Sequence, residues 1–118
     1  MTDSILQTIK QMLGLDPDCD DFNTDVIVFI NDALFTLGQL GIGSKDFYSI
    51  DGDEQTWSEF LEDVKNYEAV KKYVYLKTRL GFDPPSSSFV IQSIEKQIAE
   101  TEWRLMIEAE GRVQNDSG

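Results

Sequence analysis

A glycine and two prolines divide the C-terminal half of this chain into two helices. Apolar residues recur at helical spacing over residues 67–80 and again over 88–106, and the residues between them include the run Gly-Phe-Asp-Pro-Pro-Ser. The inward stripe predicted for the second run consists of Val90, Ile91, Ile94, Ile98, Leu105 and Met106. Gly81 can end a helix with a left-handed cap, and neither proline can continue one. Asp83 precedes a proline, which favours an extended backbone. The serines at 86–88 are well placed to cap the helix that follows. The sequence therefore predicts a stiff junction that holds a long C-terminal helix at a fixed angle.

Three further helices are predicted before this junction. Ser4 or Asp3 can cap a first helix, which Gly14 ends. A second helix starts near Asn23 and is apolar over more than half its circumference, which is typical of the central helix of a core. The run Thr56-Trp57-Ser58-Glu59 has the pattern of a capping box and predicts a short third helix that continues through Val64.

Together these elements predict a mostly α fold, a small bundle of about five helices with a long C-terminal helix. The connection over residues 41–55 is rich in Gly and Asp and has room for a short strand pair at most. At 118 residues the chain fits one domain with one core, which we assign to residues 1–110. Residues 111–118 lack an apolar pattern and are predicted to form a mobile tail.

The charge balance is strongly acidic. The chain has 22 Asp and Glu against 10 Lys and Arg, a formal net charge of −12. Such a field repels duplex nucleic acid and anionic membranes, so direct DNA binding is disfavoured. Three interpretations stay open: a solubilising surface, a face that mimics DNA, and the wall of a passage along which DNA slides without sticking.

Cysteine usage and hydropathy bound the cellular setting. A single cysteine, Cys19, excludes an intramolecular disulfide. The N-terminus has no charged-then-apolar signal, and no apolar run approaches the roughly 18 residues that span a bilayer. The sequence therefore predicts a protein of the reducing cytosol that does not enter membranes.

We find no pattern for a catalytic site, a cofactor or a metal. The chain has no histidine, the commonest general base and zinc ligand. The acidic neighbours of Cys19 disfavour a thiolate nucleophile. Residues 16–27 match the first carboxylates of a calcium loop, but Asp21 replaces its essential glycine and Ile27 its last glutamate. The glycines within 38–43 lack the preceding strand and the Lys-Ser/Thr ending of a phosphate loop.

Aromatic and basic side chains gather in the C-terminal half. Tyr73 and Tyr75 are two positions apart on one helix, so both cannot face the same core. Either one of them is half-buried at the core rim, or Tyr75 or Trp103 anchors a protein interface. The basic residues either support head-to-tail pairing with the acidic half of another copy, or form ordinary helix surface with a Glu100–Arg104 ion pair. These basic residues are Lys71, Lys72, Lys77, Arg79, Lys96 and Arg104.

Three stretches carry a resemblance to a known family. They are Ile5-Leu6-x-x-Ile9-Lys10-x-x-Leu13-Gly14, then Ile30-Asn31-x-x-Leu34-x-x-Leu37-x-Gln39-Leu40-Gly41, then Tyr75-Leu76-Lys77-x-Arg79-Leu80-x-Phe82-Asp83-Pro84-Pro85 ahead of a helix ending Glu102-Trp103-Arg104-Leu105. Their order and spacing resemble the head–tail connector (adaptor) proteins of tailed phages and prophages of Gram-positive bacteria. The resemblance covers the chain from Ile5 to about Met106.

The resemblance implies a structural virion protein that is not an enzyme and uses no cofactor. Its subunits form a ring, usually dodecameric, that assembles in the host cytoplasm and docks between the portal protein and a stopper or the next connector. DNA passes through such a ring without specific binding, so acidic residues are expected on its inner wall. An alternative function is that of a small acidic regulator that mimics DNA.

Candidate residues follow for two roles. The channel-facing candidates are Asp46, Asp51, Asp53 and Glu54, with the acids of residues 16–21 as the other possibility. The candidates for contact with protein partners are Tyr75, Phe82, Asp83, Pro84, Pro85, Trp103, Arg104 and Ile107.

Overall fold

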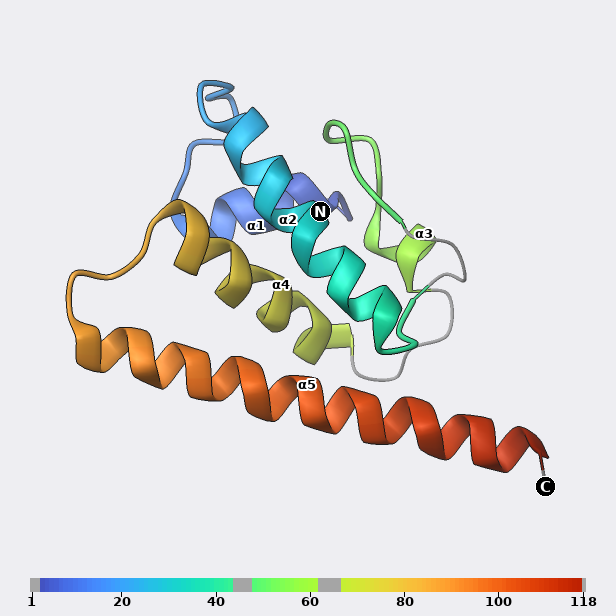
Figure 1. Cartoon of the computed structure of the whole chain (residues 1–118). Coiled ribbons are helices and arrows are strands. Elements are labelled where there is room, and N and C mark those ends of the chain that lie inside the picture. The colour runs from blue at the N-terminus through green and yellow to red at the C-terminus, as the bar shows by residue number, and fades with distance from the viewer. Residues whose placement is uncertain (1–2, 44–47, 62–66, 118) are drawn as a thin grey trace.

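Helices dominate the computed structural model, which describes residues 3–43, 48–61 and 67–117 (Figure 1). In chain order the helices of these residues are α1 (Ile5–Leu13), α2 (Asn23–Gln39), α3 (Trp57–Phe60), α4 (Tyr67–Phe82) and α5 (Ser88–Ser117). Within the described residues strand pairing is limited to an isolated bridge between Ser4 and Thr56. The mostly α prediction is confirmed.

The helix ends follow the sequence signals in the N-terminal half. The Ser4 side chain accepts a hydrogen bond from the Gln7 amide at 3.2 Å, and Gly14 ends α1 with φ at 80°. Thr56 and Glu59 form the predicted capping box at the start of α3. This helix ends at Phe60 with Leu61 as its C-cap, so the predicted continuation is wrong at Leu61, and residues 62–64 lie outside the described residues.

A single core forms where α1, α2 and α4 meet, and α3 closes one end of it. Burial of these apolar side chains is the main force that holds short helices together. Its largest fully buried members are Trp57, Tyr73, Phe60, Ile5, Leu6, Ile9, Ile30, Leu34, Leu37, Ile42 and Leu105.

The junction before α5 differs from the prediction in one respect. Gly81 lies inside α4, which continues to Phe82, and its φ is not positive, so the predicted left-handed cap at Gly81 is wrong. A Cβ added at Gly81 would overlap the ring of Phe29 from α2. Glycine therefore serves close packing of α2 on α4. The predicted serine cap is confirmed, because the Ser87 hydroxyl accepts a hydrogen bond from the Val90 amide at 3.4 Å.

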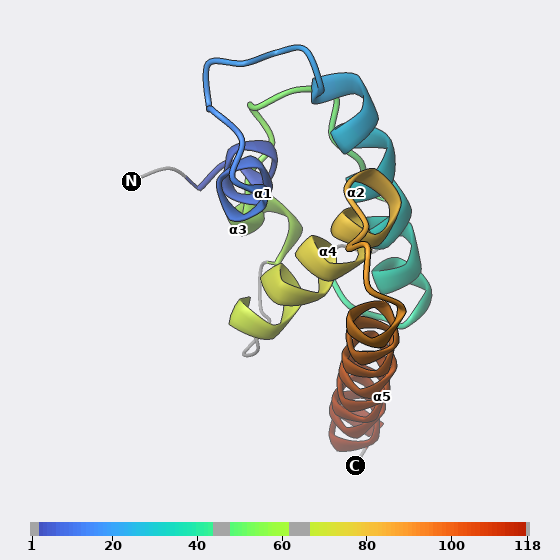
Figure 2. The ribbon, with the colours of Figure 1, turned by 90° about the vertical axis from the view of Figure 1, so that its left-hand side faces the viewer.

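The last helix lies along α4 and extends past the rest of the molecule at its C-terminal end (Figures 1 and 2). It packs through Ile94, Ile98, Leu105 and Ala109. Val90 is 39% exposed, so its predicted place on the inward stripe is wrong. The backbone of α5 is helical to Ser117, eleven residues beyond the predicted end at 106, and the mobility of 111–118 stays a prediction.

Candidate functional site

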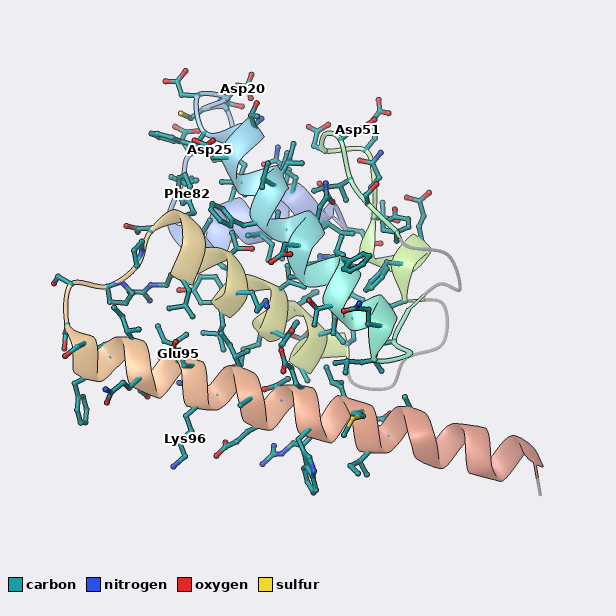
Figure 3. The ribbon with its side chains drawn as sticks, viewed as in Figure 1. Asp20, Asp25, Asp51, Phe82, Glu95 and Lys96 are labelled. Carbon is teal, nitrogen blue, oxygen red and sulfur yellow. The ribbon has the colours of Figure 1, made fainter. Side chains whose placement is uncertain are left out.

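The outward face of α5 carries a line of large side chains. Phe89, Lys96 and Trp103 are spaced by seven residues, and Ile107 follows four residues later, so the four share the face opposite the buried stripe. Phe89 is 80% exposed, Trp103 61% and Ile107 45%. Figure 3 shows Lys96 pointing away from the body of the molecule. We call these four residues the outer stripe of α5.

Arg104 lies beside the outer stripe of α5. It makes no ion pair with Glu100, although both side chains are described, so the predicted pair is not formed. Arg104, Glu100, Ala99 and Trp103 line a shallow pocket of about 350 Å³. An exposed indole next to an arginine is the composition found at the centre of protein interfaces.

A partly buried hydrogen bond fixes α5 against α4. The Tyr73 hydroxyl donates to a carboxylate oxygen of Glu102 at 2.6 Å. Burial raises the pKa of Tyr73, because it disfavours the charged phenolate. The Glu102 carboxylate raises this pKa further, because it repels a second negative charge beside it. The bond sets which face of α5 turns inward, and so which residues form its outer stripe.

The two tyrosines of α4 divide as their spacing requires. Tyr73 is fully buried, whereas Tyr75 is half-buried at the edge of the core. The Tyr75 hydroxyl accepts a hydrogen bond from Arg79 at 3.2 Å. Tyr75 is thus a half-buried residue at the core rim, and the accessible part of its ring also leaves room for the other interpretation, an anchor of a protein interface.

The end of α4 borders a second pocket. The Phe82 ring packs edge-on against Phe22, with 5.5 Å between ring centroids. A pocket of about 570 Å³ opens here, with apolar walls and two carboxylates at its rim; its lining residues are Leu15, Phe22, Asp25, Phe29, Gly81, Phe82 and Asp83. Of the remaining junction candidates, Pro85 is half-buried and Pro84 is exposed.

A buried lysine anchors the first acidic loop. Lys10 is 1% exposed, and its ammonium group donates to the carbonyls of Pro17 at 3.2 Å and Cys19 at 2.6 Å. The loop backbone is thereby fixed while Asp16, Asp18, Asp20 and Asp21 stay exposed. Among the described residues no group of three or more His, Cys, Asp and Glu side chains could hold a metal ion.

A second acidic loop is tied to α2. The Asn31 side chain and the Ile50 backbone exchange two hydrogen bonds, at 3.0 and 2.7 Å. The candidates Asp51, Asp53 and Glu54 are all exposed on this loop, and Asp46 lies outside the described residues. Figure 3 shows Asp20 and Asp51 on one side of the molecule and Lys96 on the opposite side.

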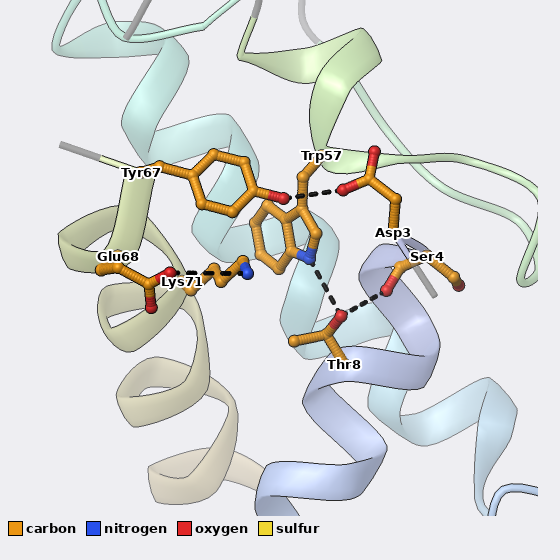
Figure 4. A network of polar contacts seen from close by, with 7 residues as sticks. All are labelled: Asp3, Ser4, Thr8, Trp57, Tyr67, Glu68 and Lys71. Atoms are coloured by element: carbon orange, nitrogen blue, oxygen red, sulfur yellow. Dashed lines mark hydrogen bonds and ion pairs between the residues drawn. The ribbon is translucent and has the colours of Figure 1, made fainter. Parts of the chain in front are cut away.

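A polar network holds the N-terminal segment and α3 to α4 (Figure 4). The Asp3 carboxylate accepts hydrogen bonds from the Ser58 hydroxyl at 2.6 Å and the Tyr67 hydroxyl at 2.7 Å. The Trp57 indole donates to Thr8 at 3.1 Å. Hydrogen bonds from Ser58 and Tyr67 lower the pKa of Asp3. The network is structural, because it joins the segments that close the core.

Sequence reasoning missed Phe89, the most exposed large apolar side chain of the outer stripe. The signal was present, because residues 89, 96 and 103 are seven apart within one predicted helix. A prediction that turns Val90 inward assigns no role to its neighbour Phe89, which lies on the exposed face.

Comparison with known proteins assigns the family. The family model of phage connector proteins matches residues 5–112. No curated protein and no solved structure matches the chain. No described helix has both the length and the apolarity to cross a membrane. The family is a structural one, and it implies a virion component that interacts with portal and tail proteins. The match spans more than half of the sequence, and this chain belongs to the phage connector protein family.

Proposed function

We propose that the protein is one subunit of a ring that docks below the portal, extends the DNA channel and provides the surface on which a stopper or tail protein assembles. The outer stripe of α5 carries this proposal. Large apolar side chains lie on the most extended helix, and soluble proteins rarely group such residues on a surface without a binding role.

The portal contact is assigned to the C-terminal part of α5. This part extends beyond the other helices, where it can reach a neighbouring protein without unfolding the body (Figure 1). Trp103, Arg104 and Ile107 are exposed there. Residues 111–118 become ordered on the portal in this scheme. The junction at Phe82–Pro85 sets the angle at which α5 is presented.

The channel wall is assigned to the exposed acids of the second loop, Asp51, Asp53 and Glu54, with Asp46 as a further member. Carboxylates repel the phosphates of passing DNA, so the DNA can slide without being held. The loop is pinned to α2 by Asn31, which allows a fixed wall. The first acidic loop is the other candidate for this position.

The ring is proposed to hold about twelve copies, in line with the resemblance, and to assemble in the host cytoplasm before it becomes part of the virion. No observation favours the DNA-mimic alternative. Mimicry needs carboxylates spaced like phosphates along one face, whereas the exposed acids here lie on two separate loops and on several helices.

The test is to mix the purified protein with the portal complex of its own phage and to image the mixture by negative-stain electron microscopy. We expect class averages with an added ring of rotational symmetry below the portal. Absence of added density at high protein excess, with folded protein confirmed by circular dichroism, would overturn the proposal.

A further inference from the structure

The outward face of α2 combines apolar and acidic side chains. Val28 is 59% exposed and Phe35 44%, and the exposed Asp25 and Asp32 lie on the same face. These residues follow the 3–4 spacing of one helix face, opposite the buried residues of α2. We call Asp25, Val28, Asp32 and Phe35 the acidic stripe of α2.

The outward face of α4 has the opposite charge. Lys72 is exposed, and Arg79 reaches back to donate to the Tyr75 hydroxyl. Lys72, Tyr75 and Arg79 are spaced by three and four residues, so they share one face, which we call the basic stripe of α4. Glu68 lies at the N-terminal end of this face, where it is paired with Lys71 at 3.8 Å.

The two stripes face away from each other. Contact between α2 and α4 runs through their inner sides, as the close approach of Phe29 to Gly81 shows. Val70, Tyr73 and Val74 are buried on the inner side of α4, so its basic stripe points away from α2. By helical spacing the acidic stripe lies opposite the buried residues of α2, and within it the Asp32 carboxylate is near enough to Tyr73 to contribute to the raised pKa of that side chain. A surface and its complement on opposite sides of one subunit can join copies head to tail.

The charges on the two stripes have the same spacing. Asp25 and Asp32 are seven residues apart, as are Lys72 and Arg79, so each pair spans about 10.5 Å of helix. An apolar side chain lies between the charges on each helix, Val28 on α2 and Tyr75 on α4. The charge content of the chain agrees: residues 1–66 hold 14 acidic and 3 basic side chains, and residues 67–118 hold 8 and 7.

We propose that neighbouring subunits of the ring contact each other through the basic stripe of α4 on one copy and the acidic stripe of α2 on the next. The inference rests on the proposed function, because it names the subunit contact of that ring. The two helices run in roughly opposite directions (Figures 1 and 2), and a small rotation between neighbours preserves this. Asp25 then faces Arg79, Asp32 faces Lys72, and Val28 covers Tyr75.

Charge reversal tests this contact. One variant carries Lys72→Glu with Arg79→Glu, so both of its stripes are acidic. A second carries Asp25→Lys with Asp32→Lys, so both of its stripes are basic. We expect each variant alone to lose ring formation on the portal complex by at least about tenfold, because like charges then meet at every subunit contact.

The two variants mixed in equal amounts restore alternating contacts of opposite charge. The mixture should therefore form rings, as should a single chain with all four substitutions. A control, Glu95→Lys, also reverses an exposed acid, but one that belongs to neither stripe and to none of the surfaces assigned above, and it should assemble as the native protein does. Circular dichroism melts of every variant report whether it is folded.

The outcomes separate this inference from the function on which it rests. Rings formed by either reversed variant alone, or no rescue in the mixture and the four-substitution chain, would overturn the contact while native rings on the portal uphold the function. If the native protein forms no ring on the portal, the proposed function fails and the inference fails with it.

Discussion

The helical body and the last helix use their apolar side chains in different ways. In the body, α1, α2 and α4 bury residues against one another, and the tightest positions are fully inaccessible, such as Ile30, Leu34 and Val74. In α5, one stripe is buried and the opposite stripe exposes Phe89 and Trp103. The body therefore supplies most of the stability of the fold, while α5 also presents apolar side chains at the surface.

Truncation of a buried side chain in the body should have the largest effect on stability. Leu34→Ala removes a fully buried side chain at the centre of α2, and we expect a loss of about 2–5 kcal/mol in the free energy of unfolding. Urea denaturation measures this. The matched change Val28→Ala, on the outward face of the same helix, should cost less than about 0.5 kcal/mol. Similar losses for the two variants would contradict the assignment of Leu34 to the buried face of α2 and of Val28 to its exposed face.

The second-largest loss of stability is expected when a side chain is added where α2 contacts α4. Gly81→Ala places a Cβ on the Phe29 ring and should cost about 1–3 kcal/mol, since overpacking forces neighbours to move. Gly52→Ala is the control, because a Cβ there meets nothing within 4 Å and the φ of Gly52 is not positive. If the two alanines prove equally tolerated in thermal melts, the close approach at Gly81 is wrong.

A change at the hydrogen bond that attaches α5 to α4 should lower the free energy of unfolding by less than the changes in the body. Tyr73→Phe removes the hydrogen bond to Glu102 and should cost about 1–2 kcal/mol at neutral pH, whereas Tyr75→Phe should cost less. Because the pKa of Tyr73 is raised in the fold, its contribution is complete below about pH 10, the usual pKa of tyrosine, and is lost as the pH rises further. Denaturation from pH 7 to 11 should therefore show a steeper alkaline loss for the native protein. Parallel curves for the native protein and the Tyr73→Phe variant would count against the bond.

The smallest effect is expected at the N-terminal network. Asp3→Asn weakens the hydrogen bonds from Ser58 and Tyr67 and should cost about 1 kcal/mol or less at pH 7. Because the pKa of Asp3 is lowered in the fold, its contribution is present above about pH 4 and is lost as the pH falls through that lowered value. The stability difference between the two proteins should thus vanish in acid. A difference that persists at pH 2 would point to another cause.

Local signals predicted the parts of the fold that neighbouring residues determine. The caps at Ser4 and Gly14, the Thr56–Glu59 capping box and the serine start of α5 all depend on contacts within one helical turn. The role of Gly81 was misjudged because it depends on Phe29, which is 52 residues away in the sequence. Sequence patterns carry no measure of such a distant contact.

The exposure of α5 could be predicted only in part, for a related reason. Trp103, Arg104 and Ile107 are candidates for contact with protein partners, and they are exposed, while the contact itself stays a prediction. The predicted inward stripe of α5 includes Val90, which is exposed in the structure. Because α5 packs mainly against α4, only a narrow stripe of its side chains is buried. How many neighbours a helix has is a tertiary property, and the apolar pattern alone does not reveal it.

The affinity of the portal complex for a variant with Phe89→Ser and Trp103→Ser decides whether α5 is the docking helix. We expect this variant to unfold with the free energy of the native protein to within about 0.5 kcal/mol, since neither side chain is buried. We also expect its binding to the portal to fall by at least about 30-fold, the effect of losing an interface anchor. Native affinity for the portal in this folded variant would contradict the claim that α5 is the docking helix.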